Sequence, residues 1–106
     1  MEALSYGKIK LIARIVDIKG YCRAGHKVGE EFDVSLYEGG EWRSEERKSA
    51  RTPNMCCHLY YALFPYIAVL QYDGELPWLK DKDVFSMNCP DPENCVKVEI
   101  RRIRIP

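Results

Sequence analysis

The sequence predicts an α+β domain of order ββαββ, in which a small antiparallel sheet packs on one buried, proline-kinked helix. Two segments of alternating apolar residues precede residue 37, an uncharged apolar stretch covers 52–72, and two further alternating segments follow residue 82. Strands on both sides of one long helix are typical of a sheet with one covered face. At 106 residues the chain can form one hydrophobic core, so we expect a single domain, 1–106.

The first expected strand, 8–19, is rich in isoleucine, leucine and valine. Ile9 and Leu11 share one face, but Val16 and Ile18 fall on the other parity. Because side chains alternate with period two, this change of phase predicts a β-bulge near 13–15, or a strand covered on both faces.

After a glycine-containing loop at 20–29, residues 30–36 alternate as a second strand with Phe32, Val34 and Leu36 inward. Residues 38–51 are highly charged, with Trp42 as their large apolar side chain. We expect them to form a surface loop with one helical turn at 41–48.

The expected helix covers 52–72, which contains no Asp, Glu, Lys or Arg although such residues make up 30% of the chain. Thr52 as N-cap and Pro53 at the first helical position predict its start. Apolar residues recur almost all round it, so we expect a buried helix that is kinked or restarted at Pro65. The Asp-Gly pair at 73–74 predicts a left-handed residue at its end.

The last two expected strands, 83–89 and 96–105, are joined by a turn rich in proline. In the last strand the apolar residues change from even to odd numbers at 101–102, which predicts a second phase slip. Because the strands 8–19 and 96–105 each contain a phase slip, we expect these two strands to pair. Leu76 and Trp78, before this hairpin, are expected to cover one end of the core. Placing inward residues opposite one another pairs Phe85 with Ile100, Met87 with Val98 and Cys89 with Val96. A Cys89–Cys95 disulfide would disturb that register.

Five cysteines cannot all pair within one chain, and Met1-Glu2-Ala3-Leu4 lacks the basic and apolar regions of a secretory signal. We therefore expect a cytoplasmic protein with reduced thiols. The uninterrupted apolar run 59–70 is shorter than the roughly 20 residues that span a bilayer, so we expect no membrane association.

Four cysteine and histidine residues stand at the ends of expected elements. Loop ends and a helix N-terminus can converge on one rim, and Cys and His are ligands of zinc and iron. The predicted metal site consists of Cys22, His26, Cys56 and Cys89. The alternative is a set of inert thiols, since none of these residues forms a C-x2-C pair and free cysteines are often buried as small apolar side chains. Vicinal Cys56 and Cys57 would point about 100 degrees apart on a helix and would not share a ligand.

Two other functional classes remain alternatives. Cys56 lies near the expected helix N-terminus, where the helix dipole favours the thiolate form of its side chain. A histidine base beside this thiolate would indicate a thiol-redox or cysteine-dependent enzyme. Nucleic-acid binding would need a basic sheet face, which a net charge of zero disfavours. That face would consist of Lys8, Lys10, Arg14, Arg101 and Arg104.

Several motifs in order resemble those of a family of small, uncharacterised prokaryotic proteins prominent in anaerobes. They are Cys22-Arg-Ala-Gly-His-Lys-Val-Gly-Glu-Glu-Phe32, Met55-Cys56 with Ala62-Leu-Phe-Pro-Tyr66, Gly74-Glu-Leu-Pro-Trp78 and Cys89-Pro-Asp-Pro-Glu-Asn94. The chain differs from the family pattern in the 38–51 insertion, Cys57 and Cys95. The resemblance implies that the four candidate ligands occupy motif positions, but it implies no activity.

We therefore predict a small cytosolic binding or accessory domain without catalytic activity that holds zinc or iron at a Cys/His site. Its binding partner would be either a second copy of the chain or another protein.

Overall fold

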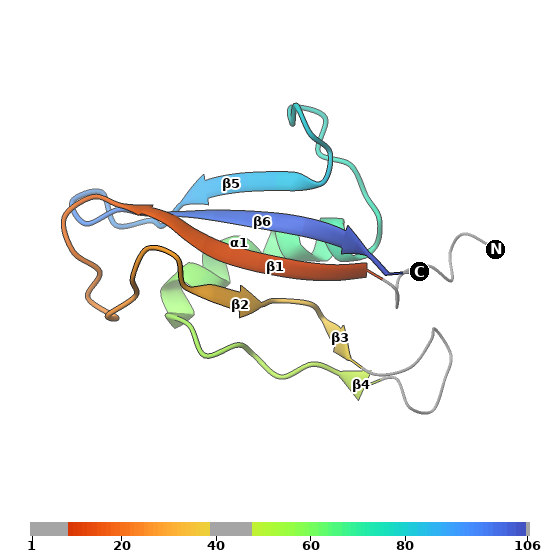
Figure 1. Ribbon diagram of the computed structural model, residues 1–106, viewed down its shortest axis with the longest axis horizontal. Coiled ribbons are helices and arrows are strands. Elements are labelled where there is room, and N and C mark those ends of the chain that lie inside the picture. The colour runs from red at the N-terminus through yellow and green to blue at the C-terminus, as the bar shows by residue number, and fades with distance from the viewer. Residues whose placement is uncertain (1–8, 39–47, 106) are drawn as a thin grey trace.

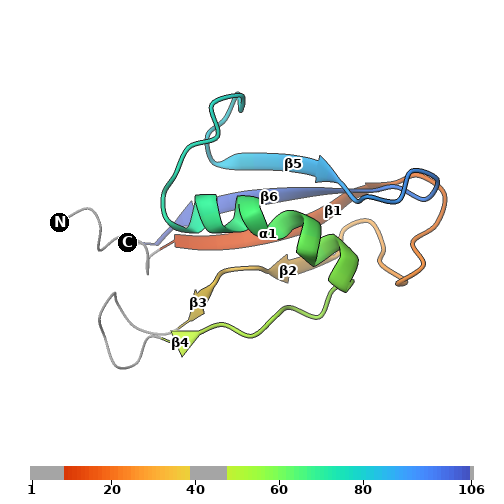
Figure 2. The same ribbon diagram turned by 180° about the vertical axis from the view of Figure 1, so that it is seen from behind.

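The computed structural model describes residues 9–38 and 48–105. Four strands form an antiparallel sheet in the order β2-β1-β6-β5, and α1 crosses one face of it, as Figure 1 and Figure 2 show from opposite sides. This arrangement confirms the predicted α+β fold and adds a two-stranded ladder of β3 and β4. The elements are β1 (Ile9–Ile18), β2 (Glu31–Asp33), β3 (Tyr37–Glu38), β4 (Lys48–Ser49), α1 (Cys57–Gln71), β5 (Val84–Asn88) and β6 (Val96–Arg104).

The hydrophobic core lies between α1 and the two central strands. Alternate residues of β1 and β6 point to the helix, and residues of α1 spaced by three or four point back to the sheet. Fully burying such aliphatic side chains contributes about 1.5–3 kcal/mol each. The buried apolar residues of these three elements are Ile9, Leu11, Ala13, Ile15, Leu59, Leu63, Ile67, Leu70, Val96, Val98 and Ile100.

Strand registers agree with the expected pairing. β1 pairs with β6, and a register shift between Ile15 and Asp17 places the predicted bulge slightly later in the strand than expected. Phe85 pairs with Ile100 and Met87 with Val98, as predicted. Beyond β5 the Cys89 N–H donates to the Val96 carbonyl at 2.8 Å, so Cys89 lies opposite Val96.

The predicted phase slip at 101–102 is wrong, because β6 alternates without interruption up to a buried Arg102. Its Nη1 donates to the carbonyls of Leu70 and Gly74, at 3.2 and 2.7 Å. Its Nη2 donates to the Lys82 carbonyl at 2.9 Å, and its Nε to Asp83 at 2.8 Å. A core-facing arginine is tolerated here because the end of α1 and Asp83 satisfy its donors.

The predicted helix start is also wrong. α1 begins at Cys57, and its N-cap residue is Cys56, whose side chain makes no capping bond. Instead the Cys56 N–H donates to the ring of His26, a partner thirty residues earlier in the chain. The helix continues through Pro65 and ends as expected, with Asp73 at a φ of 61°.

The helix is not buried all round, because one sheet covers only one of its sides. Tyr61 and Phe64 on the outer side are 82% and 45% exposed. Leu76 is buried as expected, but Trp78 is 63% exposed and does not cover the core.

The expected helical turn at 41–48 and Trp42 lie largely outside the described residues. Bordering that segment, Tyr37 pairs with Ser49 and Glu38 with Lys48. In the described part of the chain, no helix is long and apolar enough to cross a membrane.

Candidate functional site

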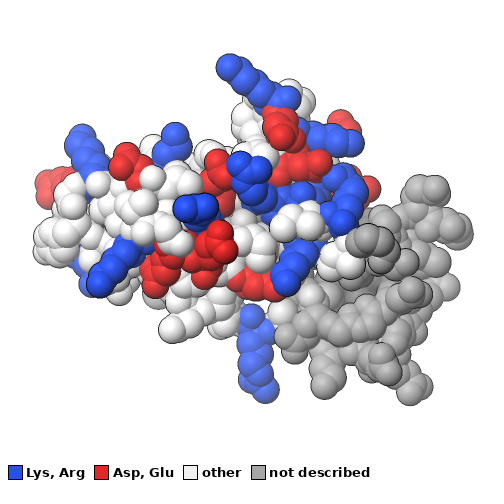
Figure 3. Space-filling model, in the orientation of Figure 1, with Lys and Arg blue, Asp and Glu red and all other residues white. Residues whose placement is uncertain are grey.

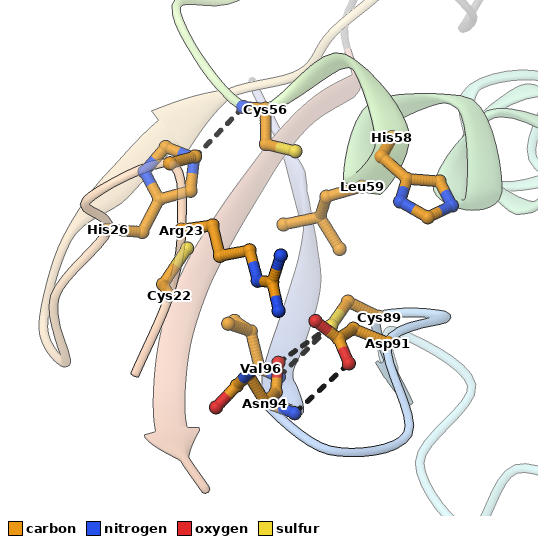
Figure 4. Close-up of a pocket in the computed structure, with 11 residues that line it drawn as sticks. Cys22, Arg23, His26, Cys56, His58, Leu59, Cys89, Asp91, Asn94 and Val96 are labelled. Carbon is orange, nitrogen blue, oxygen red and sulfur yellow. Dashed lines mark hydrogen bonds between the residues drawn. The ribbon is translucent and has the colours of Figure 1, made fainter. Parts of the chain in front are cut away.

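One pocket of about 120 Å³ lies where the loop after β1, the start of α1 and the turn after β5 meet. All four predicted ligands line it, and Figure 4 shows the three thiols around the Arg23 side chain. His58, Asp91 and Asn94 also line the pocket. The expectation that loop ends and a helix N-terminus converge on one rim is therefore confirmed.

The loop and the turn are fixed against each other at the base of this pocket. Lys19 N–H donates to the Cys95 carbonyl at 2.7 Å, and Tyr21 N–H donates to the Asn94 side chain at 3.3 Å. Gly20 has a φ of +80°, and a Cβ on it would lie 2.4 Å from Asn94 Oδ1. The positive φ favours glycine here, and the close approach leaves the segment before Cys22 beside the turn that follows Cys89.

The turn after β5 holds the Cys89 thiol by its own backbone. The Val96 N–H donates to Cys89 Sγ at 3.2 Å, and the thiol in turn donates to the Asn94 carbonyl at 3.6 Å. Asp91 Oδ1 accepts the N–H groups of Asn94 and Glu93, at 3.1 and 2.9 Å. These backbone hydrogen bonds lower the pKa of Asp91 below its usual value, so the pocket carries a carboxylate at neutral pH.

His26 links the loop to the start of the helix. Its Nε2 accepts the Cys56 N–H at 2.9 Å, and its Nδ1 lies 2.9 Å from Glu30 Oε1. The ring also packs edge-on against Phe32, with 5.2 Å between centroids, and its side chain is only 8% exposed. A neutral imidazole with its proton on Nδ1 satisfies both bonds. In this arrangement neither ring nitrogen is available to a metal ion.

The thiols share the pocket without forming a coordination sphere. Within residues 9–38 and 48–105, no three His, Cys, Asp or Glu side chains are grouped so that they could hold a metal ion. The four predicted ligands thus line one pocket, but their side chains do not point to one common position.

The other two cysteines do not line this pocket. Cys57 is exposed and lines a separate groove of α1 with Tyr61 and Phe64, so the two adjacent cysteines do point to different surroundings. Burial and the neighbouring Cys89 raise the pKa of the Cys95 thiol. All five cysteines are free thiols.

The basic residues considered for nucleic-acid binding lie among acidic ones wherever the structure describes them. Figure 3 shows acidic side chains among the basic ones on the open face of the sheet. There Lys10 lies 3.8 Å from Asp33, and Arg101 lies 2.8 Å from Glu99. Arg104 instead donates to Asp73 and Asp83, at 2.7 and 2.8 Å, beside the buried Arg102. Lys8 lies outside the described residues.

Fold and pocket together define a small α+β domain with a thiol-lined pocket at one end of its sheet. Comparisons with protein-family models, curated proteins and solved structures each found no match. The resemblance to an uncharacterised prokaryotic family therefore stays a prediction.

Proposed function

We propose that this protein is a small binding domain that takes up one thiophilic metal ion, zinc or iron, through Cys22, Cys56 and Cys89. The observation that carries the proposal is that three thiols from distant parts of the sequence line one small pocket. Thiolate sulfur is a preferred ligand of both metals.

Metal binding requires the three side chains to rotate toward one point. A zinc–sulfur bond is about 2.3 Å long, so the thiolates must approach closely around the ion. Cys22 and Cys89 stand in a loop and beside a turn, and Cys56 precedes the first helical residue. Arg23 must leave the pocket, and the charge of the ion would replace that of its guanidinium.

His26 gives no support to a catalytic role for Cys56. A general base must reach the thiol, but the nearby imidazole of His26 accepts the Cys56 backbone N–H through Nε2. We therefore assign His26 to positioning Cys56 and assign no reaction to the pocket. A reducing compartment such as the cytoplasm would keep the three thiols available.

Elemental analysis of protein purified without oxygen tests this proposal, together with thiol titration before and after denaturation. We expect about one equivalent of zinc or iron, lost with thiol protection in Cys22→Ser and Cys89→Ser. Cys57→Ser is the matched control, because its thiol lies outside the pocket and its loss should leave the metal content unchanged. Metal-free protein with freely titrating thiols, or equal metal content in all variants, would contradict the proposal.

A further inference from the structure

We infer that His58, and not the His26 indicated by the sequence, supplies the nitrogen ligand that completes this metal site. The inference rests on the proposed function and adds the identity of the fourth ligand. Three thiolates and one imidazole form a common tetrahedral zinc site.

His26 is held in place by interactions that metal binding would break. Its two ring nitrogens engage the Cys56 N–H and Glu30, and its ring lies against Phe32. Turning the ring toward a metal ion would leave the Cys56 N–H without its partner. Leaving this partly buried donor unsatisfied is unfavourable, so His26 would bind a metal ion at the expense of the helix start.

The ring of His58 is not held in this way. Its side chain lines the same pocket from the first turn of α1, two residues after Cys56. Residue 58 is exposed, and across residues 9–38 and 48–105 its ring makes no hydrogen bond or ion pair. Rotation about its side-chain torsions therefore breaks no hydrogen bond or ion pair within these residues.

The surroundings of His58 also suit a metal-bound imidazole. Histidine ligands usually donate their second ring N–H to a carboxylate or carbonyl group, which orients the ring. Asp91 lines the same pocket as His58, and its side chain comes from the turn that also holds Cys89. Asp91 is thus a partner for the second nitrogen of His58, whereas the corresponding carboxylate of His26, Glu30, is not among the residues lining the pocket.

X-ray absorption at the zinc edge of the reduced, zinc-loaded full chain tests this assignment, since it distinguishes sulfur from imidazole ligands. Wild type should show three sulfurs and one imidazole. His58→Ala should lose the imidazole signal and bind zinc at least tenfold more weakly. His26→Gln retains an acceptor for the Cys56 N–H and should keep the imidazole signal.

Two outcomes would overturn the assignment of His58 while leaving the thiol site intact. One is an imidazole signal that persists in His58→Ala, and the other is a signal that disappears in His26→Gln. A wild-type protein that binds no zinc would instead overturn the proposed function itself. Circular dichroism of each variant confirms that the comparison is made between folded proteins.

Discussion

The ring Nε2 of His26 accepts the backbone N–H of Cys56 at 2.9 Å, and this contact joins the loop after β1 to the start of α1. The first N–H groups of a helix lack partners inside the helix, and a histidine from a distant loop accepts the one that belongs to the N-cap residue Cys56. The same contact places two of the predicted ligands in one pocket.

His26→Ala should destabilise the fold by about 1–3 kcal/mol, because it leaves the Cys56 N–H unsatisfied and removes the ring from Phe32. His26→Gln, which can still accept that N–H, should lose less. Urea denaturation of both variants measures the difference. Equal stability of wild type and His26→Ala would show that the contact does not hold the helix start.

Arg102→Ala should cost about 1–3 kcal/mol, because it removes the side-chain donor to the Gly74 and Lys82 carbonyls and one of the two arginine donors to Asp83. Arg101→Ala is the matched control, since the neighbouring side chain is 63% exposed and should change stability by about 0.5 kcal/mol or less. Urea denaturation compares the two, and similar losses in both would refute the structural role of Arg102.

Acid should weaken the fold through Asp83. Burial raises the pKa of this carboxyl, but hydrogen bonds and charges from Arg104 and Arg102 outweigh it and lower the pKa below its usual value. A lowered pKa gives stability that is present above the unfolded value of about 3.9 and is lost as the pH falls through the folded value.

Asp83→Asn should therefore be less stable than wild type near about pH 7, and the gap should shrink below about pH 4 as the wild-type carboxyl becomes protonated. Urea titrations at the two pH values test this. A gap that stays constant with pH would mean that the charge of Asp83 contributes nothing.

Arg23→Ala should bind zinc several-fold more tightly, because it removes a positive charge from the space between the thiols. Lys27→Ala, in the same loop but outside the pocket lining, is the control and should bind as wild type does. Competition with a chromophoric chelator measures both affinities. Weaker binding by Arg23→Ala would mean that the guanidinium supports the ion.

Much of the sheet could be predicted because strand alternation fixes which side chains share a face. The hairpin register followed from placing Phe85 and Met87 opposite inward residues of the last strand. Arg102 was misread because a charged side chain was expected to face water, whereas the end of α1 supplies its partners. The helix start could not be found, because its N–H partner is thirty residues away in sequence.

The site was predictable to the level of a shared pocket and no further. Cys22, His26, Cys56 and Cys89 stand near the ends of elements, and such positions meet at one rim. The hydrogen bonds that occupy His26 depend on tertiary contacts that spacing does not show. His58 gave no such signal, because a residue two positions after Cys56 on one helix would point away from it, whereas in the structure Cys56 precedes the first helical residue.

The most direct test of the central claim is iodoacetamide labelling of the reduced full chain with and without zinc, with each cysteine followed by mass spectrometry. We predict that about one equivalent of zinc protects Cys22, Cys56 and Cys89 together and leaves the exposed Cys57 as reactive as before. If zinc leaves the labelling of those three thiols unchanged, or protects Cys57 equally, the pocket is not a metal site.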